Sequence, residues 1–247
     1  MSQRRITLLD ELRGLAVVLM VFYHTAYDVV YVFHLTGSGW FRSAPMALLQ
    51  RYIAFSFILI AGTMCRFSHN NLRRGARTFL CGMLVTAVTA LVMPSQLILF
   101  GILHCLGVAM MLYPLLAPLV ERLPVWAGVL LSAALYLLTA GIGQRVLGFG
   151  PFTVPLPDAL YDCGFLFPLG LHPRIFASAD YNPLLPWIFL FLAGACLGGW
   201  FKNERVPETF CRSHLPALQW VGRHALPIYL LHQPLAYAAV WVVASLL

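Results

Sequence analysis

The dominant pattern along the chain is a series of long apolar runs, each bounded by charged residues, Pro or Gly. Because a helix needs about 20 mostly apolar residues to cross the hydrocarbon core, such runs predict transmembrane helices. The predicted helices cover residues 12–33, 47–65, 77–93, 97–119, 124–142, 185–201 and 224–246. We therefore expect an all-α fold, a polytopic membrane helix bundle of seven or eight spans that forms a single domain over residues 1–247.

The composition supports this fold class. Hydrophobic residues make up 60% of the chain and charged residues 10%, with a mean hydropathy of +0.80, whereas a soluble domain carries about 25% charged residues. Basic residues precede the first apolar run, as in a signal peptide, but the run is too long and lacks a small-residue cleavage site, so we expect the helix to be retained. The six cysteines form no C-x-x-C pair, so neither a metal site nor a disulfide framework is indicated.

The distribution of basic residues predicts the orientation in the membrane. A net charge of +7 could indicate a nucleic-acid partner in a soluble protein, but here we expect none. Only Arg42, Arg51, Arg145 and Arg174 fall on one predicted side. The other twelve of the 16 basic residues fall on the opposite side, and they are Arg4, Arg5, Arg13, Arg66, Arg73, Arg74, Arg77, Arg122, Lys202, Arg205, Arg212 and Arg223. The positive-inside rule then places the N-terminus in the cytoplasm and the C-terminus outside.

The longest connection, from Gln144 to about Pro183, lies on the external side in this topology. It contains the segment "GFGPFTVPLPDALYDCGFLFPLGLHP", which is dense in aromatic residues, Pro and Gly. Because a loop of this length is seldom without structure, we expect a folded lid or re-entrant segment packed on the bundle, or an eighth, short span. The chain has no evident internal repeat, which weakens an interpretation as an inverted-repeat transporter.

The first apolar run contains two ionisable residues, His24 and Asp28, in "LRGLAVVLMVFYHTAYD". Residues four apart share a helix face, so Asp28 could accept a proton from one imidazole nitrogen and leave the other nitrogen of His24 free as a base. Ionisable groups inside a bilayer usually face the bundle interior and mark a functional path. The alternative is a structural pair that holds the bundle together.

A second histidine, His34, follows ten residues later in "YVFHLTGSGW". If the helix continued, its rise would place His34 roughly 15 Å from His24, at the outer mouth. A lone histidine at an interface is more often a solvated bystander than a catalyst.

Two further histidines lie inside predicted spans. His104, in "LFGILHCLGVAM", is flanked by Gly101 and Gly107, which allow close approach of a neighbouring helix. His232, in "IYLLHQPLAY", is followed by Gln233. For both histidines a core hydrogen bond and a contact with a ligand are comparable alternatives. Polar groups of the first, fourth and seventh helices could converge on one buried cavity.

The basic residues on the predicted cytoplasmic side also have two interpretations. Arg66, Arg73, Arg74 and Arg77 would serve as topology determinants, or as partners of a phosphorylated ligand, because guanidinium groups match phosphate oxygens. Asp10 and Arg13, in "LLDELRGLA", are expected to form an ion pair at the helix start.

Three segments resemble one family. "RRITLLDELRGLAVVLMVFYHTAYD" resembles the first-helix motif of the heparan-alpha-glucosaminide N-acetyltransferase family, and more broadly of the transmembrane acyltransferases that include acyltransferase family 3. "FGILHCLGVAMML" and "LQWVGRHALPIYLLHQPL" strengthen the likeness. The segment 144–183 resembles nothing that we can name.

The resemblance implies transfer of an acetyl group from cytoplasmic acetyl-CoA to an acceptor across the membrane, in the animal enzyme the amino group of a terminal glucosamine. Counted from "RGLA", His34 falls within a residue of the family's catalytic histidine, and His24 falls on an assisting position that is Asn in the animal protein. In acyltransferase family 3 a histidine at the level of His24 is itself the proposed catalytic residue. Both are therefore retained as catalytic candidates, with Asp28.

These inferences combine into one hypothesis, a membrane-embedded acetyltransferase of the bacterial inner membrane that modifies an amino sugar or glycan. A histidine base would deprotonate the acceptor, either for direct transfer or with an acetyl-histidine intermediate. The residues expected to bind the acetyl-CoA donor are Arg13, Arg66, Arg73, Arg74, Arg77 and His104, and those expected to bind the acceptor are His232 and Gln233. O-acylation of a cell-envelope polysaccharide and a non-enzymatic proton-coupled carrier are the alternatives. A homo-oligomer is left open.

Overall fold

The structure is a computed structural model that describes residues 5–203 and 206–246. It confirms the all-α fold class, because seven described helices are long and apolar enough to cross a membrane. Arg4 and Arg205, two of the predicted internal charges, lie outside the described residues. The elements are α1 (Thr7–Tyr27), η1 (Asp28–Val32), α2 (Ala44–Cys65), α3 (Asn71–Val92), η2 (Pro94–Gln96), α4 (Ile102–Val120), α5 (Val125–Thr139), η3 (Ile142–Gln144), β1 (Val146–Phe149), β2 (Phe152–Pro155), α6 (Ala159–Asp162), η4 (Phe167–Leu169), α7 (Leu184–Asn203), α8 (Glu208–Cys211), α9 (Pro216–Arg223) and α10 (Ala225–Leu246).

Three helices begin at least five residues away from their predicted positions, and the first of them, expected from residue 12, begins at Thr7. The helix expected from residue 77 begins at Asn71, because the side chain of Asn70 accepts a hydrogen bond from the Arg73 amide at 2.8 Å and caps the helix. Arg73 and its neighbours therefore lie in the first turns of α3 rather than in a loop. The helix expected from residue 97 begins at Ile102, whose amide donates to the Asp180 carboxylate at 3.1 Å.

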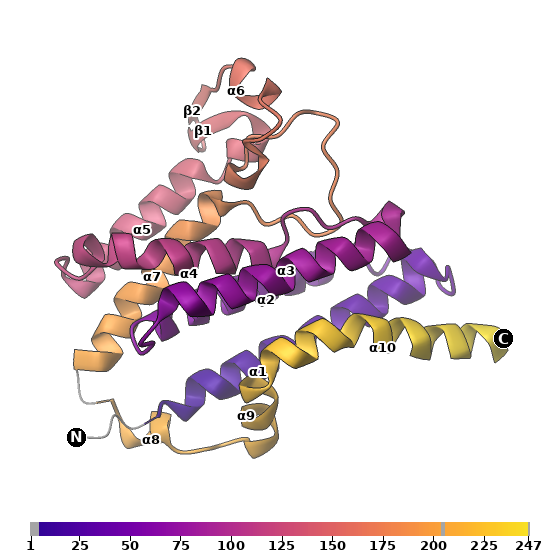
Figure 1. The fold of residues 1–247 in the computed structure, drawn as a ribbon, viewed down its shortest axis with the longest axis horizontal. Coiled ribbons are helices and arrows are strands. Elements are labelled where there is room, and N and C mark those ends of the chain that lie inside the picture. Colours follow the sequence, from indigo (N-terminus) through magenta and orange to yellow (C-terminus); the bar gives the residue numbers. More distant parts are fainter. Residues whose placement is uncertain (1–4, 204–205, 247) are drawn as a thin grey trace. The chain divides into compact units, whose positions relative to one another are not determined.

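The chain divides into two compact units. The first consists of Met1–Phe57 and Val206–Leu247, and the second is Ile58–Arg205, so α2 contributes residues to both. Figure 1 shows the elements of each unit in sequence colours.

The first unit is built on α1. Helix α10 runs beside it, and α8 and α9 lie against its N-terminal part (Figure 1). The close approach of α9 depends on two glycines, because a Cβ atom at Gly14 would lie 1.9 Å from the Leu218 carbonyl oxygen and one at Gly222 would lie 1.8 Å from the Asp10 carbonyl oxygen. Glycine here lets two backbones touch.

Charged side chains fasten the start of α1. The predicted ion pair of Asp10 and Arg13 is present at 3.3 Å, and Arg5 Nε lies 2.7 Å from the same buried carboxylate. The next residue, Glu11, is also buried and accepts hydrogen bonds from the amides of His214 and Leu215 at 2.7 and 2.9 Å. These carboxylates therefore tie the segment around α8 and α9 to α1.

The second unit packs α3 against α4 and α5 against α7. Gly107 has the predicted role, since a Cβ there would lie 2.7 Å from the Phe79 backbone nitrogen on α3. Between α7 and the end of α2, a Cβ at Gly62 would lie 1.9 Å from the Phe191 carbonyl oxygen. As in the first unit, small residues set the distance between helices.

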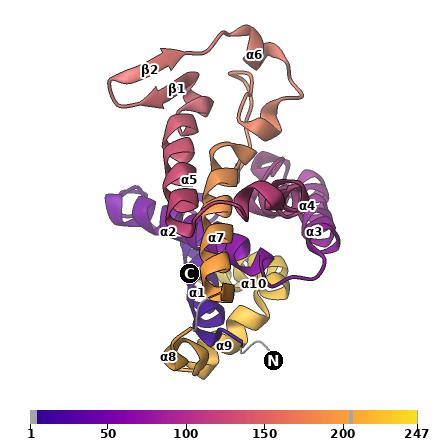
Figure 2. The same ribbon diagram turned by 90° about the vertical axis from the view of Figure 1, so that its left-hand side faces the viewer.

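The long connection between α5 and α7 is folded, as expected. It contains the antiparallel hairpin β1–β2 and the short helices α6 and η4, and the hairpin follows the end of α5 (Figure 2). Its last residues bond to the chain before α4, where the Asn182 amide donates to the Phe100 carbonyl at 2.9 Å. Among the described residues of this connection there is no helix long enough to be an eighth span.

Asp180, at the end of this connection, is a half-buried residue that the sequence did not single out. It accepts from the Ile102 amide and from the Asn182 side-chain amide at 2.6 Å. Burial raises the pKa of Asp180, while the two donated hydrogen bonds lower it. Asp180 thus ties the end of the connection to the start of α4.

Candidate active site

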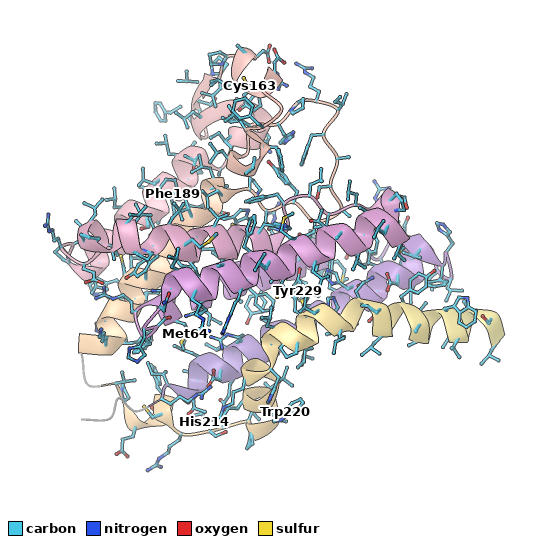
Figure 3. The ribbon with its side chains drawn as sticks, in the orientation of Figure 1. Met64, Cys163, Phe189, His214, Trp220 and Tyr229 are labelled. Carbon is cyan, nitrogen blue, oxygen red and sulfur yellow. The ribbon has the colours of Figure 1, made fainter. Side chains whose placement is uncertain are left out.

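The most closely coupled pair of histidines lies in the first unit. Nδ1 of His24, on α1, is 2.6 Å from Nε2 of His232, on α10, and the two rings are stacked with their centroids 4.9 Å apart. On its other side His232 Nδ1 lies 2.6 Å from the Tyr229 carbonyl oxygen, one turn earlier on α10. Tyr229 is labelled on α10 in Figure 3. The three groups form one continuous hydrogen-bonded chain.

This chain fixes the protonation of both neutral rings. A carbonyl oxygen only accepts, so the nitrogen of His232 that faces Tyr229 must carry a proton, and Nε2 of His232 is then the acceptor. His24 must therefore donate through Nδ1. Nε2 of His24 is left with a lone pair, and it makes no hydrogen bond among the described residues. The geometry thus presents one unprotonated imidazole nitrogen, which is what a general base requires.

Asp28 does not have the partner that the sequence predicted. Its carboxylate accepts from Nε2 of Gln233, at 2.8 and 3.1 Å to the two oxygens, and no hydrogen bond joins it to His24. The expected orientation of His24 by Asp28 is therefore wrong. The reason lies in the packing of α10 on α1, because His232 of α10 is the partner of His24 and the adjacent Gln233 is the partner of Asp28.

Gln233 brings a second polar atom into the site. While its amide nitrogen donates to Asp28, its Oε1 atom is buried and has no hydrogen-bond partner in the described part of the chain. A buried acceptor without a partner costs free energy. It is therefore suited to receive a proton donor from a bound ligand.

His34 is placed differently from the expectation. Helix α1 passes into a π-helical turn, η1, in which the Phe33 amide donates to the Asp28 carbonyl at 2.9 Å, and the helix ends there. His34 lies beyond that end with a φ of 53°, in the left-handed region, and its side chain is exposed. The distance estimate for a continuous helix does not apply, and no hydrogen bond within the described residues links His34 to the histidine pair.

His104 lies in the second unit. His104 is in the first turn of α4, and its ring packs between the rings of Phe79 and Phe100. Its Nε2 is 3.5 Å from the Thr86 hydroxyl oxygen. Nδ1 is buried and has no partner among the described residues, and Gly82 makes room for the ring, since a Cβ there would lie 2.9 Å from that nitrogen. Convergence of His104 with His24 and His232 stays a prediction.

The arginines expected to bind the donor differ in how far they are already engaged. Arg66 forms an ion pair with Glu121 and donates to the Tyr113 hydroxyl, and Arg74 donates to the Met64 carbonyl. Met64 is labelled in Figure 3. By contrast, Arg73 and Arg77 project from α3 with exposed side chains. These two are the most accessible cations of the set.

The structure adds one basic site that the sequence analysis missed. A cavity in the first unit is lined by Arg5, Thr7, Glu208, Cys211, Arg212 and Arg223. Three of the lining residues are arginines, whose guanidinium groups can bind an anion. No spacing of residues along the chain indicated this cavity, because its lining comes from segments near both ends of the chain.

Comparisons with known proteins identify the family of this chain. The family model for the catalytic region of heparan-alpha-glucosaminide N-acetyltransferase matches residues 5–234, which include both units. Searches of curated proteins and of solved structures find no match. The matched range includes the histidine pair and its polar neighbours, and the described residues contain seven helices apolar enough to cross a membrane. Because the match covers nearly the whole chain, this integral membrane protein belongs to the heparan-alpha-glucosaminide N-acetyltransferase catalytic family.

Proposed function

We propose that the protein transfers an acetyl group from cytoplasmic acetyl-CoA to an amino sugar or glycan on the opposite side of the membrane, with His24 as the general base. One observation carries this proposal, namely the hydrogen-bonded chain from Tyr229 through His232 that leaves His24 Nε2 unprotonated. The family match supports the transferase class over a proton-coupled carrier. Since the match includes both units, we treat residues 1–247 as one functional domain.

In the proposed reaction, His24 Nε2 removes a proton from the attacking nitrogen or hydroxyl of the acceptor as that atom bonds to the thioester carbonyl carbon. The C–S bond then breaks, and CoA leaves as the thiolate, which takes up the proton that His24 removed, so that Nε2 of His24 is again unprotonated. The positive charge that forms on His24 is shared with His232 through the Nδ1 hydrogen bond. Gln233 Oε1 accepts a second hydrogen of the acceptor and is held in place by Asp28. His34 remains a second catalytic candidate, on the resemblance alone.

The sidedness of the reaction can be tested in proteoliposomes. With labelled acetyl-CoA on one side and glucosamine or oligosaccharides on the other, we expect acetylated acceptor to form in the compartment that does not contain the donor. Base-resistant label would identify N-acetylation, and label released by mild base would identify the O-acylation alternative. Transfer only when donor and acceptor share a compartment, or none to any acceptor, would refute the proposal.

We further propose that Arg73 and Arg77 bind the phosphates of the donor. Their side chains are exposed at the start of α3, whereas Arg13 and Arg66 are held in ion pairs. The positive-inside rule supports a cytoplasmic location for this end of α3, in the inner membrane of a bacterium. The cavity with Arg212 and Arg223 is the second candidate, because it is concave.

Replacing Arg73 and Arg77 together with Gln should raise the KM for acetyl-CoA about tenfold, because charge-assisted hydrogen bonds to phosphate are lost. The increase should shrink at high salt. The matched control is Arg51→Gln, which removes an exposed arginine from the other predicted side. An unchanged KM after the double substitution, with an increase after replacing Arg212 and Arg223, would move the donor site to the cavity.

A further inference from the structure

The hairpin β1–β2 in the second unit has one entirely apolar face. In the antiparallel register Phe149 pairs with Phe152 and Leu147 pairs with Val154. Directly paired residues point to the same side of a hairpin, as do residues two apart along a strand. All four side chains therefore lie on one face. Phe149, Phe152 and Val154 are 64%, 84% and 64% exposed, so this face is not covered by the described chain.

The hairpin is held in a defined shape at both ends. At the tip, Gly150 and Pro151 form a two-residue turn in which Gly150 has a φ of 57°, and type II′ turns require a positive φ at this position. At the base, Arg145 and Asp158 form an ion pair, and the Leu156 amide donates to the Arg145 carbonyl at 2.8 Å. The exposed apolar face is thus presented by a closed hairpin rather than by a loose loop.

The positions of the charges point to lipid as the occupant of this face. Residues 146–157 contain no charged side chain, and both flanking charges, Arg145 and Asp158, are gathered at the base. The candidate span Val125–Gln144 ends two residues before β1 begins. The exposed apolar side chains of this span include Leu130, which is 69% exposed. The hairpin therefore begins where a candidate membrane span ends, and its apolar face carries no charge that would keep it away from lipid.

We infer that the hairpin lays its Leu147, Phe149, Phe152 and Val154 face on the bilayer surface at the C-terminal end of α5. Aromatic side chains are favoured at the interface between hydrocarbon and headgroups. An exposed apolar patch on a protein that already borders lipid lowers its free energy by contacting that lipid. The hairpin would then act as a lateral support that keeps the connection between α5 and α7 at the membrane surface. This inference does not depend on the proposed reaction.

Photocrosslinking can identify what covers the face. The protein in phospholipid nanodiscs is prepared with Phe152→benzoylphenylalanine, a close match in shape, and is irradiated and analysed by intact mass. We expect adducts with the mass of one phospholipid. The matched control is Thr153→benzoylphenylalanine, because Thr153 pairs with Gly148 and points to the opposite face. It should give several-fold less lipid adduct. Leu130→benzoylphenylalanine shows that lipid crosslinking is efficient in the same nanodiscs.

Each other product would overturn the inference in a recognisable way. A crosslinked dimer would assign the face to a second copy of the chain. A crosslink to another segment of the same chain would identify a closing lid. Equal lipid labelling at Phe152 and Thr153 would contradict the assignment to one face, and no adduct at Phe152 while Leu130 is labelled would show that the hairpin faces water.

Discussion

Replacing His24 with alanine is expected to lower acetyl-transfer turnover about 10²- to 10⁴-fold, the range typical for the loss of a general base. The substitution removes the only nitrogen of the hydrogen-bonded chain that carries a free lone pair. Turnover is measured per folded molecule in proteoliposomes. Size exclusion and thermal unfolding in detergent show whether the variant retains its fold.

The role of His232 can be separated from that of His24 by a double-substitution cycle. If His232 acts through His24, His232→Ala should lower turnover by itself, and the double variant should be no slower than His24→Ala alone. Effects that multiply would indicate that His232 contacts the substrate independently. A His34→Ala variant measured in parallel decides between the two catalytic candidates. Loss of turnover in that variant, with near-normal turnover in His24→Ala, would exclude His24 as the base.

The largest effect on stability is expected from Gly14→Ala. The new methyl group would lie 1.9 Å from the Leu218 carbonyl oxygen, and backbone atoms cannot move aside as a flexible side chain can. Overpacking of this kind costs about 3 kcal/mol or more when the whole contact must separate. We expect a clear drop in the thermal unfolding temperature, measured in detergent with a thiol-reactive dye, and loss of the contact between α1 and α9.

The matched control for this substitution is Gly39→Ala in the same unit, where an added Cβ would meet nothing within 4 Å. It should leave the unfolding temperature nearly unchanged. If Gly14→Ala unfolds at the wild-type temperature, the two helices do not approach as closely as the structure places them.

The spans could be predicted from the sequence because a membrane-crossing helix requires one long apolar run, and such a run can be recognised without knowing what packs against it. The ends of the helices were less predictable, since they depend on single capping groups. Asn70, directly before α3, is a common capping residue and could have been recognised. The cap of α4 could not have been recognised, because Asp180 lies 78 residues along the chain from Ile102, whose amide donates to it.

The candidate site shows a similar limit. The sequence identified His24, Asp28, His232 and Gln233 as polar residues in apolar helices, and the structure brings all four together. Their pairing could not be deduced, because periodicity gives the face of a helix but not the helix that packs on it. The prediction therefore joined the two residues that were neighbours on α1, while the structure pairs each of them with a residue of α10.

The π-helical turn after Tyr27 also affects how this chain should be aligned with its relatives. A π turn differs from an α turn by a single residue, so one insertion or deletion there can be absorbed without disturbing the helix before it. Counting from the "RGLA" motif is a sound guide to homologous positions as far as Asp28. Beyond that residue an offset of one does not distinguish equivalent from different positions. A shift of one residue between His34 and a relative's histidine is therefore a difference that this π turn can absorb.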